Sequence, residues 1–147
     1  MYAWQKKTME LVAETNFRTI HLVYDRDVGN MGKSIFCEWL EYKGLAFEVP
    51  PLTSAEDLAQ FVFDFPISRT YLIDLPKAMP KNKLAGLYAG IEQLKNGKVY
   101  NKRYKGQKKT FNRPNVIVFS NKLPNLDWLS ADRWNIHTIS DDKDFDN

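Results

Sequence analysis

The spacing of apolar residues along the chain switches between two periods, one typical of helices and the other typical of strands. Apolar side chains that recur every three or four positions predict helices with one buried side. These segments are residues 3–14, 33–42, 54–63 and 80–94. Short runs of β-branched and aromatic residues lie between them and predict strands. The runs are residues 19–24, 45–49, 69–74, 116–119 and 134–139.

Strands that alternate with helices predict an α/β fold, in which helices cover both faces of a mostly parallel sheet. Two further segments complete the pattern, an irregular basic hairpin over residues 97–111 and a short helix over residues 125–131. We expect one domain over residues 1–140, with residues 1–16 as its N-terminal helical region. The acidic residues 141–147 are expected to fray as a disordered tail.

The positive charge of the chain is concentrated on one segment. The whole sequence has 21 basic and 18 acidic residues. Residues 95–113 contain no acidic residue, and outside this segment 13 basic residues face 18 acidic ones. Its cations are Lys95, Lys98, Lys102, Arg103, Lys105, Lys108, Lys109 and Arg113. This local excess predicts an anionic partner for the segment.

The composition disfavours several other classes of protein. The one cysteine, Cys37, cannot form a disulfide within the chain, which fits an intracellular setting. No apolar run approaches the roughly 18 residues that span a membrane, and the first residues lack the apolar region of a secretory signal. His21 and His137 each lie in an expected strand without a metal-like partner, so we interpret both as structural.

The sequence Gly29-Asn30-Met31-Gly32-Lys33-Ser34 stands between an expected strand and an expected helix, which is the setting of a phosphate-binding loop. Its glycines let backbone N–H groups approach phosphate oxygens, and the helix N-terminus adds partial positive charge. Lys33 would reach the β- and γ-phosphates, and the Ser34 hydroxyl would ligate Mg²⁺. Asp27 occupies the place, six residues before the lysine, where the full motif has glycine. The alternative is a glycine turn before a helix that contains Lys-Ser.

Asp74 ends an apolar strand at what should be the ligand-binding edge of the sheet, the position of a carboxylate that orients Mg²⁺. The alternative is an aspartate that merely ends a strand. A second acid, which would activate the attacking water, usually follows, but Leu75 and Pro76 stand there. Glu92 on the next helix is one candidate for that role, and a solvent-facing helix glutamate is the alternative interpretation.

Asn121 and Arg133 are two further candidates. Asn121 follows an apolar strand, where its side chain would hydrogen-bond the γ-phosphate or the attacking water, or would simply start a turn. Arg133 would stabilise phosphoryl charge at a neighbouring subunit as an arginine finger, or would pair with Asp132 on the surface.

The basic hairpin has the composition of a nucleic-acid contact. Cations neutralise phosphates, and the interleaved aromatic residues Tyr100, Tyr104 and Phe111 can stack on unpaired bases. The alternative is a solvated hairpin whose tyrosines pack on the domain. The residues expected to contact DNA are Lys98, Tyr100, Lys102, Arg103, Lys105, Lys108 and Lys109.

The order of these elements resembles superfamily 3 helicase domains, and within them the Rep proteins of circular, Rep-encoding single-stranded DNA viruses and related plasmids. The resemblance covers about residues 4–139, and the phosphate loop is its most specific part. Tyr24-Asp25, Ile73-Asp74-Leu75-Pro76 and residues 129–134 look like the nanovirus- and smacovirus-like branches.

The resemblance implies an AAA+-like domain that uses ATP and Mg²⁺ and assembles into a ring, typically a hexamer, that moves along single-stranded DNA. It gives the Walker A role to Lys33 and Ser34, the Walker B role to Asp74 and the motif C sensor role to Asn121. The hairpin would contact DNA, and Arg133 would be the arginine finger. Rep proteins also carry an N-terminal nicking endonuclease with paired histidines and a tyrosine. Nothing here matches it, so we expect an excised helicase domain.

Two other functions stay open on the sequence. A single-stranded DNA-binding module with a silent ATPase is favoured by the missing second acid, whereas a P-loop kinase for a small substrate is disfavoured by the basic hairpin and by the lack of an arginine-rich lid. The expected location is the host nucleus for a eukaryotic virus, or the cytoplasm for a prokaryotic plasmid or phage.

Overall fold

The computed structural model describes residues 1–14, 16–26, 32–76, 78–101, 103, 106–130 and 132–146. Five parallel strands form one sheet in the order β2-β3-β6-β1-β7, and two antiparallel strands, β4 and β5, form a separate hairpin. The strands are β1 (Ile20–Tyr24), β2 (Phe47–Glu48), β3 (Thr70–Asp74), β4 (Lys98–Tyr100), β5 (Lys108–Thr110), β6 (Asn115–Ser120) and β7 (Trp134–Thr138). The predicted α/β fold with a mostly parallel sheet is therefore confirmed.

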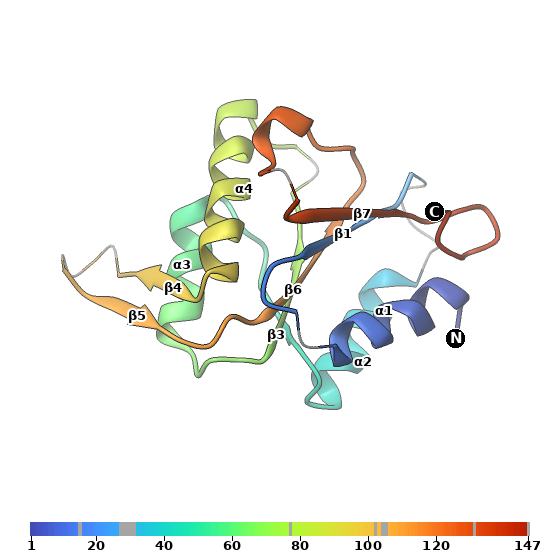
Figure 1. Cartoon of the computed structure of the whole chain (residues 1–147), viewed down its shortest axis with the longest axis horizontal. Helices are drawn as coiled ribbons and strands as arrows, with labels where there is room; N and C mark the ends of the chain where they lie inside the picture. The colour runs from blue at the N-terminus through green and yellow to red at the C-terminus, as the bar shows by residue number, and fades with distance from the viewer. Residues whose placement is uncertain are drawn as a thin grey trace.

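Helices cover both faces of the sheet, as Figure 1 shows. They are α1 (Ala3–Ala13), α2 (Lys33–Tyr42), α3 (Ala55–Asp64) and α4 (Lys81–Lys95), and a single 3₁₀ turn, η1 (Leu126–Trp128), precedes β7. The short helix expected over residues 125–131 is thus reduced to one turn. The Asn125 side chain accepts a hydrogen bond from the backbone N–H of Asp127 and so caps this turn.

The alternation of side chains along each strand divides the core into two layers. Leu22, Tyr71 and Val118 belong to the layer that also contains the buried residues of α3 and α4. Leu72 and Phe119 belong to the other layer, with the buried residues of α1 and α2. The strands are apolar on both faces because both faces are covered by helices.

The acidic tail differs from the sequence-based expectation of a disordered segment. Phe145 pairs with Ile139 in an isolated bridge, stacks on the ring of His137 and packs against the layer beneath α1. The backbone N–H of Trp4 donates to the carbonyl of Lys143 at 3.0 Å, and Lys7 pairs with Asp144 at 2.8 Å. A partly buried aromatic residue and contacts to α1 therefore hold residues 141–146 against the domain.

The hairpin of β4 and β5 projects at the left of Figure 1, away from the two chain ends, which lie together at the right. It follows α4 directly through Gly97, whose positive φ of 78° suits glycine. A Cβ at this position would lie 2.2 Å from the carbonyl oxygen of Phe111, so the two strands approach too closely for any other residue. Within the described part of the chain, no helix combines the length and the apolar character needed to cross a membrane.

Candidate functional site

The parallel strands bring several predicted site residues to one edge of the sheet, which we call the carboxyl edge because the strands end there. Tyr24 of β1 pairs with Ser120 of β6, and Asp74 of β3 pairs with Phe119 of the same strand. β6 therefore lies between the strand that enters the phosphate loop and the strand that ends at Asp74. Neighbouring strands are about 4.8 Å apart, so their ends form one compact site.

Lys33 and Asp74 are in direct contact at this edge. The Lys33 ammonium lies 3.1 Å from a carboxylate oxygen of Asp74, with 17% of the lysine side chain and 56% of the aspartate side chain exposed. Both residues line one small cavity with Ser34, whose hydroxyl stands in the first turn of α2. A lysine, a hydroxyl and a carboxylate around one cavity are the groups that hold Mg²⁺ and nucleotide phosphates.

Gly32 is the one glycine of the predicted loop that the structure describes, and it has a left-handed conformation with φ of 72° just before α2. Gly29, Asn30 and Met31, which we also predicted to bind phosphate, lie outside the described residues, as does Asp27. The N–H groups in the first turn of α2 have no partners within the helix, which is the basis of anion binding at a helix N-terminus.

Asn121 lies at the same edge, one residue beyond β6. Its side-chain amide donates to the backbone carbonyl of Asp25 at 3.3 Å, and the N–H of Asp25 donates to the carbonyl of Ser120 at 2.9 Å. These bonds fix Asn121 beside the start of the phosphate loop, where a side chain that senses the γ-phosphate would have to lie.

Two titratable residues at the cavity, Cys37 and Glu48, were not assigned from the sequence. Burial raises the pKa of the Cys37 thiol to about 12, and Glu48 and Asp74 add to this shift, so the thiol stays protonated and unreactive. Burial also raises the pKa of Glu48, with Glu41 as the next contributor. Glu48 ends β2 and thus brings a second carboxylate to the cavity from the strand beside Asp74. Its position at a strand end was the available signal.

The acid missing after Asp74 is not replaced by Glu92, and this sequence-based candidate was wrong. Glu92 accepts hydrogen bonds from the Ser130 N–H at 3.0 Å, the Ser130 hydroxyl at 2.5 Å and the Trp134 indole at 2.7 Å. Burial tends to raise the pKa of Glu92, but these hydrogen bonds outweigh it and lower the pKa. The glutamate therefore anchors the start of β7 at the opposite edge of the sheet, which we call the amino edge.

Arg133 also lies at the amino edge, immediately before β7. Its guanidinium donates to the side-chain oxygen of Asn96 at 3.0 Å, so Asn96 rather than Asp132 is its partner among the described residues. Its Nε is buried without a hydrogen-bond partner in the described part of the chain. Arg133 and Lys33 therefore lie at opposite edges of the sheet within one chain.

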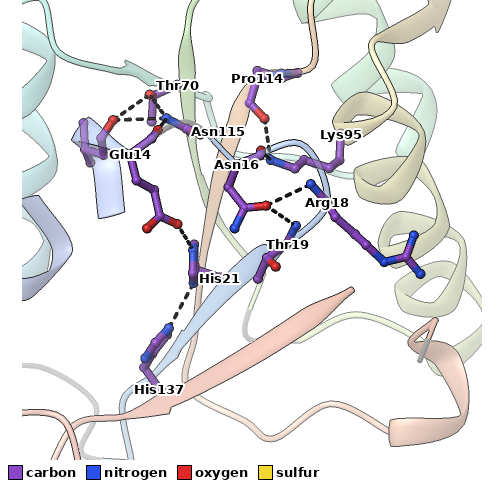
Figure 2. Close-up of polar contacts among 11 residues, drawn as sticks. Glu14, Asn16, Arg18, Thr19, His21, Thr70, Lys95, Pro114, Asn115 and His137 are labelled. Carbon is purple, nitrogen blue, oxygen red and sulfur yellow. Dashed lines mark hydrogen bonds and ion pairs between the residues drawn. The ribbon is translucent and has the colours of Figure 1, made fainter. Parts of the chain in front are cut away.

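A network of polar contacts at and near the amino edge joins residues that are far apart in the chain, as Figure 2 shows. The fully buried Lys95 donates to the carbonyls of Asn16 at 2.5 Å and Pro114 at 2.8 Å, and burial lowers its pKa to about 8. His21 lies 3.0 Å from His137 and 2.9 Å from Glu14. The two histidines, which we interpreted separately, thus form one chain of contacts that links β1 to β7.

The described part of the hairpin has one outward face and one tethered face. Lys98, Tyr100 and Lys108 are exposed, and Tyr100 pairs with Lys108 across the two strands. Lys109, on the other face, donates to the carbonyls of Phe63 and Phe65 at the end of α3. Arg103 pairs with Asp64 through two contacts of 3.0 Å, which compete with any contact to DNA. Lys102, Tyr104 and Lys105 lie outside the described residues.

Comparisons with known proteins place this chain beside one group. It is 35% identical over 142 residues to Para-Rep C6 of Subterranean clover stunt C6 alphasatellite, and 30% identical over 135 residues to Para-Rep C10 of Milk vetch dwarf C10 alphasatellite. Para-Rep C3 of Milk vetch dwarf C3 alphasatellite is 29% identical over 147 residues. The homologues of this chain are therefore Para-Rep proteins of alphasatellites. No protein-family model matches the chain.

The similarity to the Para-Rep proteins covers 88% of this chain but 45% of Para-Rep C6 and of Para-Rep C10. The chain therefore spans about half the length of the curated relatives it matches. The matched part contains most of the domain, so the relatives and this chain share the region in which the carboxyl-edge site lies.

The residues at the carboxyl edge fit Mg²⁺ bound together with a nucleotide. Among the described residues, no group of three or more histidine, cysteine, aspartate and glutamate side chains could hold a metal ion. Mg²⁺ in nucleotide sites needs no such group, because it keeps several waters and takes one or two protein ligands plus phosphate oxygens. Ser34 and Asp74 would supply the protein ligands.

Proposed function

We propose that this chain is the ATP-driven helicase domain of a replication initiator, which hydrolyses ATP with Mg²⁺ and moves on single-stranded DNA. The observation that carries the proposal is the meeting of Lys33, Ser34 and Asp74 around one cavity at the carboxyl edge. The similarity to proteins named Para-Rep supports a role in replication.

Each residue at the site has a defined task in this proposal. Lys33 and the N–H groups at the start of α2 would bind the phosphates, while Ser34 and Asp74 would hold Mg²⁺, which would supply positive charge against the phosphate oxygens. Asn121 senses the γ-phosphate. Glu48, which reaches the same cavity from β2, is the second carboxylate that orients the attacking water.

The two edges of the sheet suggest how subunits cooperate. The hairpin and Arg133 lie toward the amino edge, whereas the phosphate site lies at the carboxyl edge. In a ring of identical subunits, the amino edge of one subunit would face the nucleotide of its neighbour. Arg133 would then act as an arginine finger, and the exposed Lys98, Tyr100 and Lys108 would contact single-stranded DNA.

A single-stranded DNA-binding module with a silent ATPase is the second candidate. It is favoured by Leu75, which follows Asp74 and is buried in the core, so that no acid stands directly after the metal-binding aspartate. The hairpin would keep its role in that case, while the phosphate site would bind nucleotide without turnover.

One assay separates these functions: hydrolysis of ATP with Mg²⁺, measured with and without single-stranded DNA. Stimulation of hydrolysis by DNA is the result that the helicase proposal predicts. Binding of ATP and DNA without turnover would support the silent module. Formation of ADP only together with a phosphorylated small acceptor would contradict both and indicate a kinase.

A further inference from the structure

Gln5 connects the first turn of α1 to the phosphate loop. Gln5 is a buried polar residue, with 8% of its surface exposed. The side-chain oxygen accepts the backbone N–H of Tyr2 at 2.9 Å, and the side-chain nitrogen donates to the carbonyl of Gly32 at 3.3 Å. Because the Tyr2 N–H can only donate, it fixes which end of the amide faces Gly32.

The direction of the Gly32 carbonyl determines the direction of the Lys33 N–H at the proposed phosphate site. This carbonyl also accepts the N–H of Phe36 at 3.1 Å, which is the first hydrogen bond of α2. The peptide between Gly32 and Lys33 is planar and trans, so the N–H of Lys33 points away from this carbonyl. Fixing the carbonyl therefore aims the Lys33 N–H outward from the helix N-terminus, in the direction from which a phosphate is bound.

The fit between Gln5 and Gly32 is close. A Cβ on Gly32 would lie 3.0 Å from the Gln5 side-chain nitrogen and 3.7 Å from the ring of Tyr2. Gly32 has a φ of 72°, which other residues rarely adopt, so its conformation favours glycine, and a side chain here would also press on the Gln5 amide. The last glycine of the loop is thus held between α1 and α2.

The first turn of α1 is itself firmly placed. Trp4 is fully buried and meets the rings of Phe36 and Phe119 edge-on. The Lys143 carbonyl and Asp144 of the tail hold the same end of α1 through Trp4 and Lys7. Gln5 is consequently presented to Gly32 from a rigid support.

We infer that Gln5 is a positioning residue for nucleotide binding, which orients the peptide between Gly32 and Lys33 toward the phosphates. The inference rests on the proposed ATPase function and extends the nucleotide site to α1, outside the phosphate loop and the sheet. Gln5 acts before catalysis, so it sets the affinity for nucleotide and leaves the rate of the bound complex unchanged.

The test compares Gln5→Glu, Gln5→Ala and the neighbouring control Lys6→Ala in the whole chain, with Lys6 being exposed on α1. Gln5→Glu keeps an acceptor for the Tyr2 N–H but places a carboxylate oxygen against the Gly32 carbonyl. The probe is mant-ATP with Mg²⁺, and the measurements are its Kd, the KM and kcat for ATP, and the melting temperature of each variant.

We expect both Gln5 variants to raise Kd and KM by about 3–10-fold, the effect of one hydrogen bond, with kcat within about twofold of wild type. Gln5→Glu should have the larger effect, and Lys6→Ala should match wild type. Unchanged nucleotide affinity in folded Gln5 variants overturns the inference but not the proposed function. A lower melting temperature without a change in Kd overturns it too, because Gln5 would then be purely structural. Wild-type protein that binds no nucleotide overturns both.

Discussion

The two edges of the sheet carry similar kinds of residues for opposite purposes. At the carboxyl edge, Lys33 contacts Asp74, and both line one small cavity. At the amino edge, Lys95 is fully buried between two carbonyls, and Glu92 accepts three hydrogen bonds, two from Ser130 and one from Trp134 at the start of β7. Residue type alone therefore does not distinguish a ligand-binding residue from an anchor.

What distinguishes the two edges is whether the polar side chains satisfy buried backbone groups or stand beside backbone groups that are left for a ligand. The amino-edge residues saturate backbone carbonyls and N–H groups that would otherwise be buried without partners, and such groups are costly to leave unpaired. The carboxyl-edge residues come from strand ends and from the start of a helix, where backbone groups are left for a ligand. Substitutions at the carboxyl edge should change chemistry, and those at the amino edge should change stability, with Arg133 as the exception because it would act on a neighbouring subunit.

Arg133 is the amino-edge residue for which we expect the largest effect on chemistry. Arg133→Ala should lower ATP turnover by about 10³–10⁵-fold, the range of known arginine fingers. The measurement mixes Arg133→Ala with Lys33→Ala, each inactive alone. Mixed rings contain some interfaces with both residues intact, so part of the activity should return. A verified mixed assembly that recovers no activity would instead leave Arg133 as a structural partner of Asn96.

Asp74 tests whether the carboxyl edge binds a metal. Asp74→Asn should lower Mg²⁺-dependent turnover by about 10²-fold, while the affinity for ATP falls much less, because the loop backbone holds most of the phosphate. Turnover across a Mg²⁺ titration and nucleotide binding by fluorescence give the two values. Equal losses of binding and turnover, with an intact melting curve, would argue against a metal role.

The hairpin permits a comparison between exposed and tethered lysines. Replacing Lys98 and Lys108 by alanine should weaken single-stranded DNA binding. The slope of log K for binding against log salt concentration should become shallower by about 0.7 per lost phosphate contact. Lys109→Ala is the matched control, since its ammonium is held by the end of α3, and it should affect stability more than DNA binding. An unchanged salt slope in the double variant would reject contact with phosphates by these two lysines.

Glu92 has the smallest expected effect and tests the amino edge as an anchor. Glu92→Ala removes three hydrogen bonds and should lower the free energy of unfolding by about 2 kcal/mol, without changing the Kd for ATP. Denaturant unfolding and nucleotide titration measure these quantities, with the exposed Gln93→Ala on the same helix as the control. A folded, stable Glu92→Ala protein that binds ATP but does not hydrolyse it would restore Glu92 as a catalytic candidate.

The fold and the carboxyl edge could largely be predicted because their signals are local. The helix over residues 33–42 and the strand that ends at Asp74 follow from apolar spacing, and parallel strands must end at a common edge. The amino edge could not be predicted, because its contacts join residues far apart in the chain. Glu92 accepts a hydrogen bond from Trp134, and Lys95 donates one to the carbonyl of Asn16. No pattern in the sequence indicates either of these contacts.

The packing of the tail and the position of Glu48 also could not be predicted from the sequence. Residues 141–146 have the composition of a frayed end, but Phe145 finds an apolar layer that only the folded domain creates. Glu48 lies on a strand of two residues, and its proximity to Asp74 depends on the pairing of β2 with β3. Both features require the strand order, which apolar spacing does not supply.

The most direct test of the account compares Lys33→Ala with Lys43→Ala, a lysine at the other end of the same helix, which is exposed. The measurement is Mg²⁺-dependent ATP hydrolysis in the presence of single-stranded DNA. Lys33→Ala should keep the melting temperature of wild type and lose at least about 10²-fold in turnover, the effect of removing one preorganised charge from a phosphate site. Lys43→Ala should match wild type. Equal turnover in the two folded variants would contradict a phosphate site at the carboxyl edge.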